Sequence, residues 1–146
     1  MIVHIASDHA GFEAKEITKK FLKELGHMPV DFGTHSDDSV DYPDFAIQVA
    51  EKINSGEHEI GVLICGSGQG MCMTANKFPK VRGALVYSSE VAKLSRQHNN
   101  ANILCLPGRQ LKPDQIKQIL ESWFASNFDG GRHERRVNKI QSLTDQ

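Results

Sequence analysis

The segment LICGSGQGMCMTANK, residues 63–77, places a cysteine directly before a turn that holds three alternating glycines. Because glycine has no side chain, successive backbone N–H groups in such a turn can converge on a phosphate, or on an oxyanion that forms during a reaction. The helix expected next presents unpaired N–H groups and the positive end of its dipole, and both favour the thiolate of Cys65. The segment predicts an anion site beside a reactive thiol. The plainer alternative is that Cys65 is the last buried residue of a strand.

The glycine pattern G-S-G-Q-G differs from the G-x-G-x-x-G of dinucleotide-binding turns, and no acidic residue ends the following strand to hold a ribose. We therefore expect no nicotinamide cofactor. Cys72 and Cys105 fall inside a predicted helix and a predicted strand, where burial alone explains them. Three cysteines without a C-x-x-C spacing indicate neither a disulfide framework nor a zinc site, and they fit a reducing cytoplasm.

Other groups suited to chemistry follow predicted elements. Asp8 and His9 come after the first strand, Arg109 comes after the last strand, and His98 with Asn99 comes after the fourth helix. For the Asp8–His9 pair and for His98 with Asn99, the alternative is a capping role at a helix end.

A basic tail ends the chain. Arg132 and Arg136 are four residues apart, so on a helix they share one face and can hold a phosphate between them. A solvated basic surface is the simpler reading. The glycines at positions 130 and 131 form a hinge that would let residues 130–146 swing across a partner subunit.

The apolar pattern alternates between strands and helices five times. Strands are expected at 2–6, 28–32, 60–65, 81–87 and 101–107, and helices at 11–25, 43–55, 69–77, 89–97, from 113 and, as a terminal arm, from 132. Parallel strands need crossovers that pack on the faces of the sheet. We therefore predict one domain, residues 1–146, with an α/β fold: a Rossmann-like three-layer α/β/α sandwich around a five-stranded parallel sheet, plus a C-terminal helical arm.

Ligands of such sheets bind beyond the carboxyl ends of the strands, near the point where the winding reverses. If strands 2–6 and 60–65 flank that point, Asp8, His9 and Cys65 face one crevice. We expect this end of the sheet to gather a thiol, imidazoles, a carboxylate and a guanidinium.

The charge pattern restricts the partners. The net charge is −1, from 17 basic and 18 acidic residues, so no electrostatic footprint for nucleic acid or an anionic membrane is present. The first residues lack the features of a signal peptide, and no apolar run approaches the length of a membrane span. A cytoplasmic protein with a small-molecule ligand is expected.

Together, the segments SDHAGF, DYPDFA, LICGSGQGMCMTANK, LSRQHNNANIL and GGRHERRV resemble the ribose-5-phosphate isomerase B family, which includes galactose-6-phosphate isomerase subunits. The resemblance covers almost the whole chain. It implies a metal-free, cofactor-free intramolecular oxidoreductase of the pentose phosphate pathway, which interconverts ribose 5-phosphate and ribulose 5-phosphate through an enediolate. It also implies homodimers or homotetramers whose active sites are built from two chains.

The resemblance also implies roles for residues. Cys65 would be the base, as in the cysteine branch of the family, and His98 would assist opening of the sugar ring. The residues expected to bind the substrate are Asp8, His9, Gly66, Ser67, Gly68, Gln69, Gly70, Asn99, Arg109, Arg132 and Arg136. The arginines are the natural phosphate ligands.

Three alternatives stay open. The substrate can be a six-carbon sugar phosphate, galactose 6-phosphate or allose 6-phosphate, because one extra carbon changes the length of the pocket and not the reacting groups. A non-catalytic phosphosugar-binding protein and a cysteine hydrolase with a Cys65–His98 dyad are the others.

Overall fold

The structure is a computed structural model that describes residues 1–57 and 59–144. Its strands are β1 (Ile2–Ser7), β2 (Met28–Asp31), β3 (Ile60–Cys65), β4 (Gly83–Leu85) and β5 (Ile103–Pro107). Its helices are α1 (Phe12–Glu24), α2 (Tyr42–Ser55), α3 (Gln69–Ala75), α4 (Ser89–Asn99), α5 (Pro113–Ala125) and α6 (Arg132–Leu143). The predicted alternation of strands and helices and the terminal helix are confirmed.

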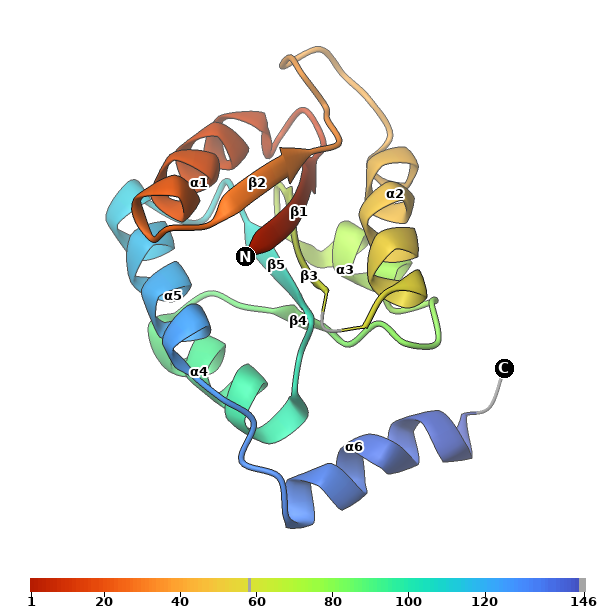
Figure 1. Cartoon of the computed structure of the whole chain (residues 1–146). Coiled ribbons are helices and arrows are strands. Elements are labelled where there is room, and N and C mark those ends of the chain that lie inside the picture. The colour runs from red at the N-terminus through yellow and green to blue at the C-terminus, as the bar shows by residue number, and fades with distance from the viewer. Residues whose placement is uncertain (58, 145–146) are drawn as a thin grey trace.

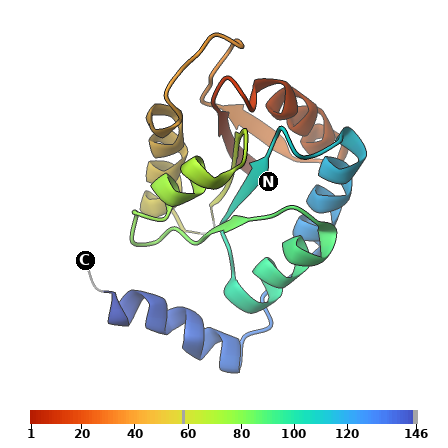
Figure 2. The ribbon, with the colours of Figure 1, turned by 180° about the vertical axis from the view of Figure 1, so that it is seen from behind.

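The elements form three layers, as predicted (Figure 1). Helices α1, α4 and α5 pack on one face of the sheet, and α2 and α3 cover the other, which the view from behind in Figure 2 also shows. Every residue of β3 is buried, because this strand lies at the centre of the sheet with helices on both faces. Trp123 of α5 is the largest fully buried side chain in the core between the sheet and helices α1, α4 and α5.

The five strands are parallel and lie in the order β2-β1-β3-β5-β4. The winding reverses between β1 and β3, which matches the predicted position of the reversal. Because β5 lies next to β3, the carboxyl ends of β1, β3 and β5 are neighbours. Those three ends carry Asp8, Cys65 and Arg109.

Several boundaries differ from the prediction by one or two residues. Strand β4 spans only Gly83–Leu85, because it is an edge strand that pairs with β5 alone. Helix α4 continues beyond residue 97 to Asn99, and Asn100 ends it in a left-handed conformation with φ of 48°. His98 and Asn99 therefore belong to the last turn of the helix.

Helix α6 lies away from the three-layer body (Figure 1). Gly130 and Gly131 both have positive φ, which fits the predicted hinge. None of the residues of α6 is buried, and Ile140 and Leu143 are exposed apolar side chains on it. Residues 145 and 146 of the predicted arm lie outside the described part of the chain. In the described ranges, no helix is both long enough and apolar enough to span a membrane.

Candidate active site

Backbone hydrogen bonds join the loops that follow β1, β3 and β5. The N–H of Asp8 donates to the carbonyl of Ile64 at 3.2 Å, and the N–H of Gly108 donates to the carbonyl of Cys65 at 2.8 Å. The N–H of Arg109 donates to the carbonyl of Gly66 at 3.1 Å. The carboxylate, the thiol and the guanidinium are thus attached to one rigid strand-end platform.

A cavity of about 470 Å³ opens on this platform. Its lining consists of Asp8, His9, Ala10, Tyr42, Cys65, Gly66, Ser67, Gly70, Arg109 and Gln110. Seven of the predicted site residues therefore meet in one place. A neighbouring recess of about 770 Å³ shares His9, Ala10 and Arg109 with it.

Tyr42 is a lining residue that the sequence analysis did not single out. It begins α2 within the quoted DYPDFA segment, which was the available signal. Its side chain is 41 % exposed, and its ring lies over Gly70, where an added Cβ would come within 2.5 Å of the tyrosine Cζ. Glycine at position 70 therefore allows the tyrosine ring to approach the turn.

The turn after Cys65 leaves several backbone donors free. The N–H groups of Gly66, Ser67 and Gly68 donate no hydrogen bond to any described residue. Gly68 has φ of 76°, and an added Cβ there would meet the backbone of Leu106 and Pro107 at 2.9 and 3.0 Å. Only glycine fits this position. The turn therefore has N–H groups available for a ligand, and their binding of an anion stays a prediction.

Cys65 is 5 % exposed and lines the cavity, whereas neither Cys72 nor Cys105 lines it. A hydrogen bond with Cys72 and complete burial raise the pKa of the Cys105 thiol well above its ordinary value. Cys105 therefore stays protonated in the core. This agrees with the structural role expected of Cys105.

Asp8 and His9 both have protein partners. Oδ1 of Asp8, which is 6 % exposed, accepts the N–H of Gly11 at 2.9 Å, so this carboxylate does stabilise the turn before α1. Nδ1 of His9 accepts the N–H of Val40 at 3.1 Å. Each side chain keeps a second polar atom for a ligand: Oδ2 of the carboxylate and Nε2 of the imidazole.

His98 and Asn99 do not join this cavity. Crossover helices run antiparallel to the strands, so the last turn of α4 lies at the amino edge of the sheet, opposite Cys65. Asn99 lines a different recess of about 500 Å³, beside β4 and α6. The expectation that all the imidazoles gather at one sheet end is wrong for His98 within a single chain.

The predicted phosphate ligands of the tail are likewise distant from the thiol. Arg132 and Arg136 are exposed on α6, and neither forms an ion pair with a described carboxylate. His133 of the same helix stacks on His98, with ring centroids 4.2 Å apart and planes inclined by 7°. This stack places α6, and with it Arg132 and Arg136, on the same side of the molecule as His98, at the amino edge of the sheet.

Ligand atoms of His98, Asp129 and His133 lie within 4.8 Å of one another. The lone pairs of two stacked rings lie in two separate and nearly parallel planes, so they do not converge on one ion. A metal would therefore require these rings to rearrange. The arrangement fits stacked imidazoles better than a metal centre.

Both the sequence and the structure of this chain are similar to those of known proteins. A family model described as Ribose/Galactose Isomerase matches residues 3–140. A protein of Mycoplasma genitalium named probable ribose-5-phosphate isomerase B is 45 % identical over 140 residues, which cover 94 % of this chain and 92 % of the relative.

Two solved structures are also similar over nearly the whole chain. The ribose-5-phosphate isomerase B of Clostridium thermocellum superposes with a TM-score of 0.95 at 45 % identity and covers 99 % of this chain and 97 % of its own. The enzyme of Mycoplasma genitalium with bound ribulose 5-phosphate gives a TM-score of 0.92 at 43 % identity, with coverage of 99 % and 97 %.

Proposed function

Because this chain belongs to the Ribose/Galactose Isomerase family, we propose that it is an isomerase that interconverts ribose 5-phosphate and ribulose 5-phosphate. The observation that carries this proposal is the placement of the Cys65 thiol beside the free N–H groups of the glycine turn, in a cavity that also holds Asp8, His9 and Arg109. A thiol, oxyanion donors and ligands for hydroxyl and phosphate groups are what an aldose–ketose isomerisation requires.

In the proposed mechanism, the thiolate of Cys65 removes the proton from C2 of the open-chain aldose. The electrons of the C2–H bond form a double bond between C1 and C2 while the carbonyl electron pair moves to O1, which gives an enediolate. The Cys65 thiol, whose proton exchanges with solvent, then returns a proton to C1, and the hydroxyl proton at O2 passes to O1, so that the carbonyl forms at C2. Because a proton next to a carbonyl is only weakly acidic, a base alone is inadequate. Most of the catalytic gain comes from stabilising the oxyanion.

The turn residues Gly66, Ser67, Gly68, Gln69 and Gly70 would stabilise that enediolate through their backbone N–H groups. Such donors are most effective when they are already in place before charge develops. Asp8 and His9 would bind the hydroxyl groups of the sugar, and Arg109 would hold its phosphate end. This set of donors leads us to propose that the enzyme needs no metal and no cofactor, which activity retained after exhaustive chelation would support.

His98, Asn99, Arg132 and Arg136 complete the proposed site from a second copy of the chain. Within one chain these residues lie away from Cys65, and α6 carries exposed apolar side chains that nothing else in the described chain covers. A homodimer or homotetramer in which α6 packs on its neighbour would bring His98 to the furanose ring, to assist its opening. The arginines would then reach the phosphate.

A hexose phosphate is the second candidate, because the matching family covers galactose as well as ribose isomerases. The test is to measure kcat/KM for ribose 5-phosphate, galactose 6-phosphate and allose 6-phosphate under one set of conditions. We expect the pentose phosphate to give the highest value. A clear preference for either hexose phosphate would overturn the substrate assignment, and no turnover of any of the three would favour a binding protein.

A further inference from the structure

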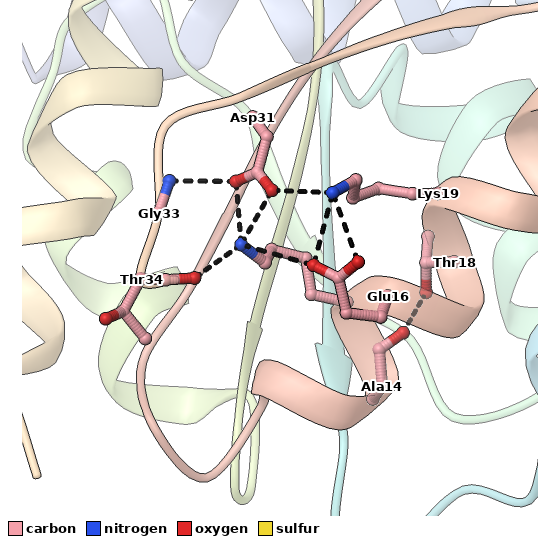
Figure 3. Close-up of polar contacts among 8 residues, drawn as sticks. Ala14, Glu16, Thr18, Lys19, Asp31, Gly33 and Thr34 are labelled. Carbon is pink, nitrogen blue, oxygen red and sulfur yellow. Dashed lines mark hydrogen bonds and ion pairs between the residues drawn. The ribbon is translucent and has the colours of Figure 1, made fainter. Parts of the chain in front are cut away.

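Lys15 is a fully buried lysine that the reaction does not use. It lies on α1 with 0 % exposure, and its ammonium donates to both carboxylate oxygens of Asp31, at 2.7 and 2.8 Å, and to the carbonyl of Thr34 (Figure 3). An ammonium has three donors, and all three are satisfied here. A buried charge with this full set of acceptors implies a geometry that tolerates little change.

The partners of Lys15 lie at the base of the loop that joins β2 to α2, residues 32–41. Asp31 also accepts the N–H of Gly33 at 2.8 Å. The backbone of Gly33 and Thr34 is joined in turn to Ser7, with N–H to carbonyl distances of 2.7 and 2.8 Å. Lys15 thus fixes the start of the loop against the end of β1, one residue before Asp8.

The far end of the same loop contacts His9. Between Thr34 and Val40 the chain is largely exposed, and among the described residues its one hydrogen bond runs from the N–H of Asp38 to Ser36 at 3.3 Å. The position of Val40 therefore depends on the two anchored ends of the loop. Lys15 holds the end that follows β2, and α2 holds the end that precedes Tyr42. Its N–H meets Nδ1 of His9 at 3.1 Å.

That contact determines where the proton of the imidazole resides. A backbone N–H can only donate, so Nδ1 of His9 must be an acceptor and carries no proton. A neutral ring then carries its proton on Nε2, which none of the described residues engages. Nε2 is the nitrogen left to donate to a sugar hydroxyl or phosphate oxygen.

We propose that Lys15 is a positioning residue: by anchoring the 32–41 loop it holds the Val40 N–H on Nδ1 of His9, and so keeps the proton of His9 on Nε2 for the substrate. This rests on the proposed function only for the identity of the ligand. The tautomer and its dependence on Lys15 are properties of the free protein.

The first measurement uses the unsubstituted protein. Nitrogen-15 chemical shifts of the His9 ring, assigned by comparison with His9→Gln, report directly which nitrogen is protonated. We expect Nδ1 to be unprotonated and Nε2 to carry the hydrogen. A ring protonated on Nδ1 would overturn the proposal whatever the activity of the protein. This measurement requires neither a substrate nor a Lys15 variant that folds.

The second measurement compares Lys15→Met with two matched controls. Lys19→Met removes the other ammonium that pairs with Asp31, at 2.9 Å, and Thr18→Val removes a buried hydrogen bond of the same helix to Ala14 (Figure 3). Neither control contacts the loop carbonyl. We expect Lys15→Met alone to shift the His9 nitrogens toward a mixture of tautomers.

The same variants give a kinetic readout. Affinity falls with the fraction of molecules that hold the competent arrangement, so we expect Lys15→Met to raise KM for ribose 5-phosphate roughly threefold to tenfold with little change in kcat. Both controls should stay within about twofold of the parental KM. Unchanged His9 shifts and an unchanged KM in folded Lys15→Met would refute the role of Lys15. If no variant turned over ribose 5-phosphate, the proposed function would fail while the tautomer result would still decide this proposal.

Discussion

Cys65 and His98 lie at opposite edges of the same sheet. Cys65 is the last residue of β3 at the carboxyl edge, whereas His98 belongs to the last turn of α4 at the amino edge. One substrate molecule cannot touch both residues of one chain in this arrangement. If both act in one reaction, two chains must share each active site, and this has consequences that can be measured.

Mixing two inactive variants should restore activity. Cys65→Ala and His98→Ala remove groups on the two sides of the proposed shared site, so a mixed dimer contains one intact site and one doubly altered site. After dissociation and random reassembly at equal concentrations, we expect about a quarter of the parental activity. Cys65→Ala mixed with Asp8→Ala is the control, because both changes lie on the same side and no intact site can form. Failure of the first pair to recover activity would contradict the shared site.

The tail arginines should contribute to substrate binding. Arg132→Ala and Arg136→Ala each remove a charge-assisted contact to the phosphate, which typically contributes about 1.5–3 kcal/mol, so KM should rise by at least about tenfold. Arg135→Ala is the matched control, since it removes the same charge from the same exposed helix but from a neighbouring face. A KM that is equally unchanged in all three variants would remove the arginines from the phosphate site.

The sequence alone predicted the part of the site that strand ends build. Asp8, Cys65 and Arg109 each lie at the end of a parallel strand, and the rule that ligands bind at the carboxyl edge of such a sheet predicts that they lie together. The order β3-β5-β4 was not predictable from local patterns, because it depends on how non-local strands pair. That order is the reason why Arg109 lies next to Cys65.

Other features escaped the sequence for physical reasons. Lys15 is buried on α1. A lysine on a helix normally lies on the solvent-exposed face, so nothing in the sequence indicates that this one is buried. Its contacts with Asp31 and Thr34 could not be predicted, because they form only when the loop after β2 folds back onto α1. The prediction for His98 was wrong because a crossover helix runs antiparallel to the strands. The last turn of α4, which contains His98, therefore lies at the amino edge of the sheet.

Two glycines of the turn should respond differently to alanine. Gly68→Ala forces a positive φ on a residue with a Cβ, at about 1–2 kcal/mol, and drives that Cβ into backbone atoms, which adds roughly 1–3 kcal/mol of destabilisation. Gly70→Ala instead pushes aside the half-exposed ring of Tyr42, so it should reduce kcat/KM with little loss of stability. Urea unfolding and kinetics of the two variants separate these effects. Equal losses of stability would contradict the assigned contacts.

Asp31 should make stability depend on pH in the acid range. Burial raises the pKa of this carboxyl, but hydrogen bonds from Lys15, Lys19 and the N–H of Gly33 outweigh burial and hold the pKa below its ordinary value. A lowered folded-state pKa means that the contribution is complete above the unfolded value, about 3.9, and is lost as the pH falls through the folded value.

The substitution Asp31→Asn tests this directly. At neutral pH it leaves the buried ammonium of Lys15 without its carboxylate, which should cost roughly 3–5 kcal/mol in the free energy of unfolding. The difference from the parental protein should shrink as the pH falls below about 4, because the carboxyl of the unfolded parental chain is then protonated and the folded carboxyl follows at its lower pKa. Asp37→Asn, which changes an exposed carboxyl in the following loop, is the matched control. A constant difference across the acid range would contradict the ion-pair interpretation.

The central claim is that Cys65 moves the proton in an aldose–ketose isomerisation. Its most direct test is the conversion of ribose 5-phosphate to ribulose 5-phosphate in deuterated water by the parental protein, Cys65→Ala and Cys72→Ala. We expect the parental protein and Cys72→Ala to turn over and to exchange solvent deuterium into the sugar. The kcat of Cys65→Ala should fall about a hundredfold to ten-thousandfold while substrate still binds. Turnover of Cys65→Ala at near the parental rate would contradict the assignment of this thiol as the base.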